Sequence, residues 1–422
     1  MSRNFWHAGW LMITLQSIPA LAQDLSAWLP QTEQVAQVIK NSPRIGAARA
    51  QHEAQLEQAR GTEAGPADWT LRLNQQQRRT QEVPSRFGET GVSMERPVRL
   101  WGKAGLDAEL AERERELARI GLADALHESS RQLLQLWWDA QRARSDWEAA
   151  QRDEQLAAEL RRQAQVRLNQ GDVAALDARL AEADLQRAQA ATHLAFAEWS
   201  RRRNQLQRLY PGLPEPVGAS RRDGPIGPIG PLGLPGQAMA DALKDYLAHH
   251  HELNLLRAEV RRQQQWAERM VRDRRPDPTV GIYVSRERSG AEQVLGLSLS
   301  MPLSGTWRDA QARTALAQAQ MKEDTLRQLE RELTADFEGR WHQLVDGQKA
   351  LQALRAAAST QALAAEKSGT AYRLGEHSMT EVIQNRRLAH EQALAADRLY
   401  LDGLRQWALL ELDAHRLWDL DD

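Results

Sequence analysis

The stretch Gly91-Val92-Ser93-Met94-Glu95-Arg96-Pro97 returns, without a gap, as Gly296-Leu297-Ser298-Leu299-Ser300-Met301-Pro302, 205 residues further along the chain. Both copies begin with glycine, alternate apolar and polar residues, and end at proline. This pattern predicts a strand with one apolar face that stops where proline offers no backbone donor. A tryptophan follows each copy, at Trp101 and Trp307. We therefore expect an internal duplication, which governs how every local pattern is interpreted.

A long helical pattern follows each tryptophan and breaks at one glycine, Gly171 in the first half and Gly375 in the second. Glycine after a helical run is a typical helix end, because it adopts the left-handed backbone of a C-terminal cap without strain. The two glycines are 204 residues apart, almost the offset of the two strands. The duplication is therefore expected to cover most of the chain.

The composition favours a helical protein and argues against nucleic acid as a partner. The chain has 422 residues, with 55 Lys and Arg against 57 Asp and Glu, so no basic surplus is available to neutralise phosphates. Its apolar content is mostly Ala and Leu, which are strong helix formers. It has no Cys, phosphate-binding glycine motif or His-Glu-x-x-His motif. We expect no enzyme activity, catalytic residue, resident metal or cofactor.

Residues 1–22 have the pattern of a secretory signal peptide. Arg3 is followed by a short apolar core and by Ala20-Leu21-Ala22, which predicts cleavage after Ala22. A buried N-terminal helix is the alternative, and Pro19 disfavours it. No later run of 18 apolar residues occurs, so we expect no transmembrane helix in the mature chain, although short alternating strands of a barrel are possible.

Each half is expected to contain an entering helix, a hairpin, a long helix and a return helix. In the first half, residues 23–210, these elements are expected over 31–61, 68–97, 104–168 and 173–208. A Pro/Gly-rich linker over 211–237 leads to the second half, residues 238–422, with elements expected over 238–272, 277–302, 307–374 and 378–417. The polar stretch near 80–86 is expected to be a loop.

The lengths of these elements predict a mainly α fold with a small β part. At 1.5 Å per residue the helix over 104–168 is roughly 95 Å long, too long for the interior of a compact domain. The entering and return helices together match one long helix, so they are expected to stack end to end beside it. The two hairpins have open edges, and closing a sheet would require strands from other copies of the chain.

These features resemble the TolC family of outer-membrane efflux channels. The resemblance rests on the duplicated helix–hairpin–helix plan, on Pro97 and Pro302, and on the turn segments Leu168–Asp177 and Tyr372–Val382. The segment Arg99–Gly105 is similar to the CzcC-like subgroup that serves heavy-metal pumps of the resistance-nodulation-division type. It departs from that subgroup at its tryptophan, where a small residue is more usual.

The resemblance implies a homotrimer in the outer membrane of a Gram-negative bacterium, extending into the periplasm. Four strands from each protomer would form a twelve-stranded membrane β-barrel surrounded by outer-membrane lipid, continued by a trimeric α-helical barrel. The helical tip would dock on a periplasmic adaptor bound to an inner-membrane pump. The implied function is a passive exit duct for heavy-metal cations. Drug or polypeptide export, or a secreted structural coiled coil without a pore, are the alternatives.

The resemblance also implies roles for residues near the two glycine turns. Glu381 and Asp177, each six residues beyond its glycine, are candidate aperture acids, since three carboxylates in a trimer repel one another and attract cations. An ordinary solvated carboxylate is the alternative for each. The candidate adaptor contacts at the periplasmic tip are Gly171, Asp172, Val173, Leu176, Gly375, Ser378, Met379 and Thr380.

Two further patterns concern the membrane and metal. Trp101 and Trp307 are expected at the membrane interface, or packed at the strand–helix junction, or both. The run His249-His250-His251 does not predict one metal site, because consecutive helix residues point in different directions. We expect solvated polar positions, with weak metal binding as the alternative. Strand alternation would direct Val92, Met94, Leu297, Leu299 and Met301 to lipid, and Ser93, Glu95, Ser298 and Ser300 to the lumen.

Overall fold

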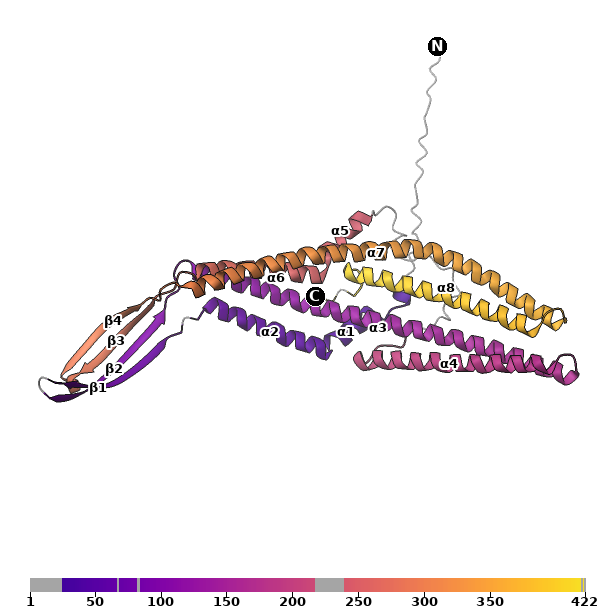
Figure 1. Ribbon diagram of the computed structural model, residues 1–422, viewed down its shortest axis with the longest axis horizontal. Coiled ribbons are helices and arrows are strands. Elements are labelled where there is room, and N and C mark those ends of the chain that lie inside the picture. Colours follow the sequence, from indigo (N-terminus) through magenta and orange to yellow (C-terminus); the bar gives the residue numbers. More distant parts are fainter. Residues whose placement is uncertain (1–24, 67, 82–83, 217–238, 419, 421–422) are drawn as a thin grey trace, which may run out of the picture.

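The fold is a long rod of helices with a small sheet at one end (Figure 1). The computed structural model describes residues 25–66, 68–81, 84–216, 239–418 and 420. The expected signal peptide, 1–22, and most of the expected linker, 211–237, lie outside these residues. None of the helices in the described ranges contains a stretch that is long and hydrophobic enough to cross a bilayer.

The elements follow the same order in the two halves. In the first half they are α1 (Thr32–Lys40), α2 (Pro43–Ala64), β1 (Thr70–Thr80), β2 (Ser85–Pro97), α3 (Lys103–Gln170) and α4 (Ala175–Leu209). In the second half they are α5 (Met239–His249), α6 (His251–Arg272), β3 (Thr279–Glu287), β4 (Glu292–Ser300), α7 (Thr306–Arg373) and α8 (Met379–Asp413). The helices α3 and α7 have 68 residues each, so each is about 100 Å long.

Several expected boundaries were wrong. The helices expected over 31–61 and 238–272 are each two helices. Ser42 and Pro43 explain the first break, since proline fits a first helical turn and the Ser42 Oγ accepts a hydrogen bond from the Ile45 N–H at 3.3 Å. In the expected loop near 80–86, Thr80 already belongs to β1, and Ser85 and Arg86 belong to β2; the return helix expected to reach 417 ends at Asp413.

The four strands form one antiparallel sheet in the order β1-β2-β3-β4, so the two hairpins are not separate. Strands β2 and β3 come from different halves and pair with Val92 opposite Val284 and Met94 opposite Ile282. The sheet is open, because within the described chain the outer edges of β1 and β4 have no partner strand. The described part of the chain therefore presents two free strand edges.

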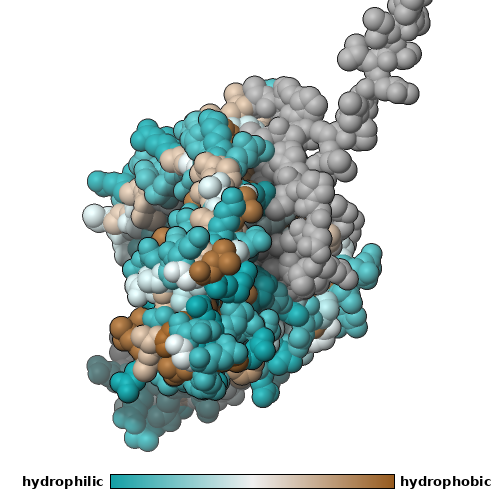
Figure 2. Space-filling view, turned by 90° about the vertical axis from the view of Figure 1, so that its right-hand side faces the viewer, coloured by the Kyte–Doolittle hydropathy of each residue, from teal (hydrophilic) through white to brown (hydrophobic). Residues whose placement is uncertain are grey.

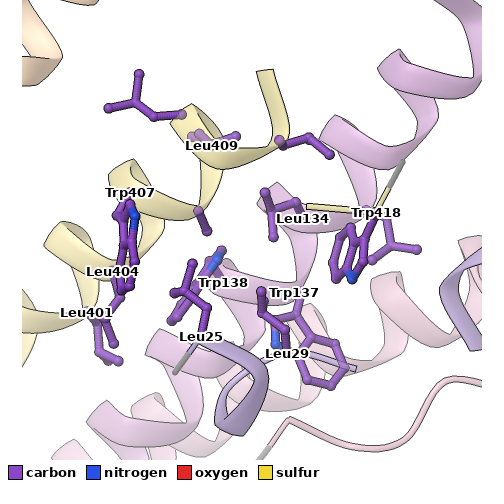
Figure 3. Packing of buried hydrophobic residues seen from close by; sticks show 14 of the residues in the cluster. Leu25, Leu29, Leu134, Trp137, Trp138, Leu401, Leu404, Trp407, Leu409 and Trp418 are labelled. Atoms are coloured by element: carbon purple, nitrogen blue, oxygen red, sulfur yellow. The ribbon is translucent and has the colours of Figure 1, made fainter. Parts of the chain in front are cut away.

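The largest core lies around α1, the middle of α3 and the C-terminal half of α8. Leu25 and Leu29 pack there against Trp137, near Leu404 and Trp407 (Figure 3). The Trp137 indole N–H donates a 2.8 Å hydrogen bond to the carbonyl of Trp28. Leu25 and Leu29 follow the expected cleavage site, so this segment of the chain is part of the core. Burying one leucine side chain there stabilises the fold by about 1.5–3 kcal/mol.

Candidate functional site

The two glycine turns lie together at the end of the rod opposite the sheet (Figure 1). Gly171 and Gly375 have φ values of 78° and 81°, which glycine adopts without strain. In both turns the residue that follows the glycine donates its backbone N–H to a carbonyl in the last turn of the preceding helix. The Asp172 N–H donates to the Arg167 carbonyl, and the Glu376 N–H donates to the Ala371 carbonyl, each at 2.9 Å. The two turns thus share one C-capping geometry.

A small apolar core lies beneath the turns. It contains Leu160, Ala164, Ala181, Tyr372, Met379, Val382 and Ile383. Met379 is 0% exposed and packs in this core with residues of α3, α4 and α7, which contradicts its expected place among the adaptor contacts. Leu176 is 63% exposed, and Val173 is half-buried against this core. The surface at this end of the rod is mostly hydrophilic with scattered apolar patches (Figure 2). The other expected contacts are exposed: Gly171, Asp172, Gly375, Ser378 and Thr380.

The two candidate aperture acids occupy the same position, the third residue of a return helix. Glu381 forms a capping box with Ser378: its Oε2 accepts hydrogen bonds from the Ser378 N–H and hydroxyl, both at 2.8 Å. The backbone hydrogen bond from Ser378 is the main cause that lowers the pKa of Glu381. Asp177 has no such partner, because Ala174 stands where Ser378 stands in α8. Glu381 therefore also has a structural role, which was not expected from the sequence.

Tyr372 joins the two hairpin tips. The Arg167 guanidinium donates to the Tyr372 carbonyl at 2.7 Å and lies over its ring at 4.8 Å. The Tyr372 hydroxyl donates to Asp177 Oδ2 at 3.4 Å. Burial, and then the Asp177 charge, raise the pKa of Tyr372. We call Arg167, Tyr372 and Asp177 the tip clamp, because they connect α3 and α4 to α7. From the sequence, Tyr372 is expected only as part of a turn segment.

A second connection lies further from the turns and involves charged groups on α3, α4 and α8. Arg386 pairs with both Asp153 and Asp184. Arg387 Nη2 lies 2.8 Å from Asp184 Oδ1, and Arg187 Nη2 lies 2.9 Å from Asp153 Oδ2. Burial alone would raise the pKa of Asp184, but the hydrogen bond from Arg387 and the neighbouring positive charges lower it overall. We call these five residues the Arg–Asp network. No sequence pattern had indicated it.

At the other end of the rod, one face of the sheet is apolar and exposed. The register places Leu71, Met94, Ile282 and Leu297 in one row across the four strands. The neighbouring rows contain Trp69, Leu73, Val92, Val280, Val284, Leu295 and Leu299, all exposed. The opposite face carries Ser93, Glu95 and Ser298, so the expected alternation is confirmed for the strand residues; Ser300 also lies there, whereas Met301 lies beyond β4. Such a contiguous apolar face marks a contact with an apolar partner.

The segment that follows β2 connects the two halves. Lys103 is 0% exposed, and its ammonium lies 3.0 Å from a carboxylate oxygen of Asp273 and of Asp277. It also donates to the Arg275 carbonyl at 2.6 Å. The Arg275 guanidinium lies over the ring of Trp101, which has a φ of 63° and is partly exposed. The segment Arg99–Gly105 is therefore a structural junction.

The remaining expected positions at this end are the second tryptophan and the prolines. Trp307 lies in the first turn of α7 and is exposed. Pro97 is the last residue of β2, whereas Pro302 lies two residues beyond the end of β4. Each proline is thus at or just past a strand end, where the missing N–H costs no ladder hydrogen bond.

The three consecutive histidines lie at the break between α5 and α6. His250 and His251 are 5% and 7% exposed, so the expectation of solvated positions was wrong for these two. The His251 ring packs against those of His127 and His415, with centroids 4.5 and 4.4 Å away. Burial lowers the pKa of His250 to about 4 and that of His251 to about 3. No group of three or more metal-ligating side chains in the described ranges is placed to hold an ion.

Several solved structures similar to this one are outer-membrane proteins. No protein-family model and no curated protein matches the sequence. The structure is similar to the outer-membrane channel OprN, with a TM-score of 0.71 and 15% identity over 92% of this chain and 90% of that one. It is similar to the CmeC outer-membrane channel of Campylobacter jejuni, with a TM-score of 0.68 and 14% identity over 92% and 85%. For the outer-membrane protein VceC of Vibrio cholerae the TM-score is 0.65, with 15% identity over 92% and 96%. The chain therefore has the fold of the TolC-family outer-membrane channels.

Proposed function

We propose that this chain is the outer-membrane exit duct of a tripartite efflux system. One observation carries the proposal: a sheet with an exposed apolar face ends a rod whose long helices run about 100 Å. A secreted coiled coil without a pore would leave this face in water, which soluble monomers avoid. Lipid covers the face without any further protein. The rod would then cross the periplasm to a pump-bound adaptor.

Three copies of the chain would complete the duct. The free edges of β1 and β4 can pair between copies, so that three four-stranded sheets close a twelve-stranded β-barrel. Closure removes the unpaired backbone groups that lipid does not satisfy. The helices of the three copies would continue the wall as an α-helical barrel. The element lengths are equal in the two halves at 68 and 35 residues for the long and return helices, which suits a regular wall.

The tip would act as the gate. The tip clamp and the Arg–Asp network both join the α3–α4 hairpin to the α7–α8 hairpin, so they hold the tip in the state described here. Adaptor binding at the exposed turn residues, among them Asp172, Leu176 and Thr380, would separate the hairpins. Three copies of Asp177 and Glu381 would line the narrowed opening. Transport itself is passive, with energy supplied by a resistance-nodulation-division pump.

Heavy-metal cations are the cargo that we propose. The subgroup resemblance of Arg99–Gly105 favours them, and so does the polar face of the sheet. That face would line the lumen and carries more acids than bases on its strands: Glu89, Glu95, Glu287 and Glu292 against Arg72 and Arg78. A negative lining favours cations over anions. Drug or polypeptide export would use the same duct without this preference.

The test is expression of the full chain in a Gram-negative host, followed by membrane fractionation and planar-bilayer conductance of the purified oligomer. We expect a detergent-stable trimer in the outer membrane and cation-selective conductance under a KCl gradient. Tyr372→Phe removes the hydroxyl of the tip clamp and is expected to open the channel more often, whereas Asp172→Asn, at the tip but outside the clamp, is not. A soluble periplasmic protein without conductance would leave the coiled-coil alternative.

A further inference from the structure

The outward face of the sheet changes character toward its hairpin turns. Beyond the apolar rows, the next row is Gln75, Thr90, Arg286 and Gln293. Two rows further out, Arg79 lies directly opposite Arg86. All three arginines are exposed, and they point to the same side of the sheet as Val92 and Leu297. We call Arg79, Arg86 and Arg286 the outward arginines.

The inward arginines of the same strands are neutralised by the protein. Arg72 lies 2.7 Å from Glu95, and Arg78 lies 2.9 Å from Glu89 and 3.2 Å from Glu287.

By contrast, the outward arginines have no hydrogen bond or ion pair with any residue that the structure describes. Arg79 and Arg86 are also like charges at directly paired positions, which destabilises a sheet unless an anion lies between them. Within the part of the chain that the structure describes, their charge therefore has no partner, and an external anion can supply one.

The position of the outward arginines indicates where this partner lies. On the helix side of the sheet, the Trp69 ring lies 5.5 Å from the Arg96 guanidinium, and tryptophan is enriched at membrane interfaces. Along the strand, the Leu73 row lies four residues from the Trp69 row, about 13 Å away, and the Arg286 row lies six residues from it, about 20 Å away. The Arg79–Arg86 row lies ten residues from the Trp69 row, about 33 Å along the strand or about 25 Å in height at a strand tilt of about 40°. In a membrane band about 25 Å tall, this pair therefore lies at the far border, and the long Arg286 side chain can extend toward it.

We propose that the outward arginines bind the phosphate groups of lipids in the outer leaflet of the outer membrane. This inference rests on the proposed function, because it requires the sheet to span that membrane with its hairpin turns outward. A guanidinium donates two parallel hydrogen bonds to one phosphate and stays charged at every physiological pH. In the trimer the three arginines of each protomer would form a basic ring around the channel. Solvated surface arginines are the alternative that the experiment must exclude.

The experiment titrates the purified trimer, in detergent, with fluorescent lipid A that has both phosphates, and with the same lipid after enzymatic dephosphorylation. Each basic residue near an anionic lipid surface strengthens binding about fivefold, so the wild type is expected to prefer the phosphorylated lipid by at least about tenfold. The triple variant Arg79→Gln/Arg86→Gln/Arg286→Gln is expected to lose this preference. The control Arg49→Gln/Arg119→Gln/Arg208→Gln removes equal charge from exposed helix positions and is expected to keep it.

The outcomes separate this inference from the proposed function. A triple variant that keeps the preference, or a wild type that has none, overturns the lipid site. Displacement of the lipid by millimolar inorganic phosphate would identify a general anion site and overturn it as well. Outer-membrane yield and conductance of the three proteins are measured in parallel: if the wild type itself is absent from the outer membrane, the proposed function fails before the lipid question arises.

Discussion

The turn between α3 and α4 and the turn between α7 and α8 have nearly identical backbones and different side-chain chemistry. Gly171 and Gly375 have the same left-handed conformation and close the same hydrogen bond. After the second turn, Ser378 and Glu381 form a capping box, whereas Ala174 leaves the start of α4 without a side-chain cap. The comparison indicates that the left-handed glycine determines the backbone path of the turn, while the side-chain cap determines the stability of the first turn of the return helix.

The largest expected effect tests whether the stability of the α3–α4 helix pair depends on its contacts with α8. Arg386 on α8 pairs with Asp153 on α3 and Asp184 on α4, all three mostly buried. Arg386→Ala leaves carboxylates buried with fewer partners, and we expect a loss of about 3 kcal/mol in the free energy of unfolding. Thermal unfolding of the purified protein, followed by circular dichroism, measures this loss. Arg398→Ala, which removes a more exposed pair with Asp146, is the control and is expected to cost under about 1 kcal/mol.

The second-largest effect tests whether the backbones of the two glycine turns contribute equally to stability. Gly171→Ala and Gly375→Ala place a Cβ on a left-handed residue, and we expect each to cost about 1–2 kcal/mol. Gly347→Ala, inside α7 where a Cβ meets no neighbour, is expected to stabilise by under about 1 kcal/mol. Denaturant unfolding of the three variants gives the comparison. If the two variants lose unequal free energies of unfolding, the shared backbone geometry does not by itself determine the stability of the turns.

A smaller effect tests the difference between the caps. Ser378→Ala removes the side-chain acceptor at the start of α8 and is expected to cost about 1 kcal/mol. The reciprocal change, Ala174→Ser, supplies an acceptor at an extended residue and is expected to stabilise the start of α4 by a similar amount. Hydrogen exchange of the first-turn amides of both helices measures each change. No gain at α4 would mean that something other than the missing hydroxyl distinguishes the turns.

The smallest effect depends on pH. Because the Ser378 hydrogen bonds lower the pKa of Glu381 below its ordinary value of 4.5, the stabilisation is complete above pH 4.5. It is lost as the pH falls through the lowered pKa of the folded state, where the carboxylate gains a proton. Amide exchange at the start of α8 is expected to accelerate below pH 4.5 more than exchange at the start of α4. In Glu381→Gln this pH dependence should disappear.

The sequence predicted the features that depend on neighbouring residues. Strand alternation, the end of a helix at glycine and long Ala/Leu-rich helices are local, and the observed bounds of α3 and α7 lie within two residues of the expected ones. The pairing of Lys103 with Asp273, the tip clamp and the Arg–Asp network join residues more than 150 positions apart. No periodicity in the sequence marks such pairs. Only the fold brings them together.

The break at His250 illustrates the same limit. Its surroundings contain no proline and no capping side chain, and the local pattern is helical. The break coincides with burial of Tyr246, His250 and His251 beside α3 and α7, where Tyr246 packs on Phe337. A helix that ran straight through would not direct all three rings inward. Tertiary packing thus overrides a favourable local propensity.

The two free edges of the sheet also have a genetic consequence. If three copies close the sheet as proposed, every seam needs the β4 edge of one copy and the β1 edge of the next. A chain with a single damaged edge would spoil any closed ring that it joins, because a cyclic assembly has no spare interface. In a cell that makes equal amounts of intact and damaged chains, only about one ring in eight would be wholly intact. Mutations in these outer strands would therefore be dominant.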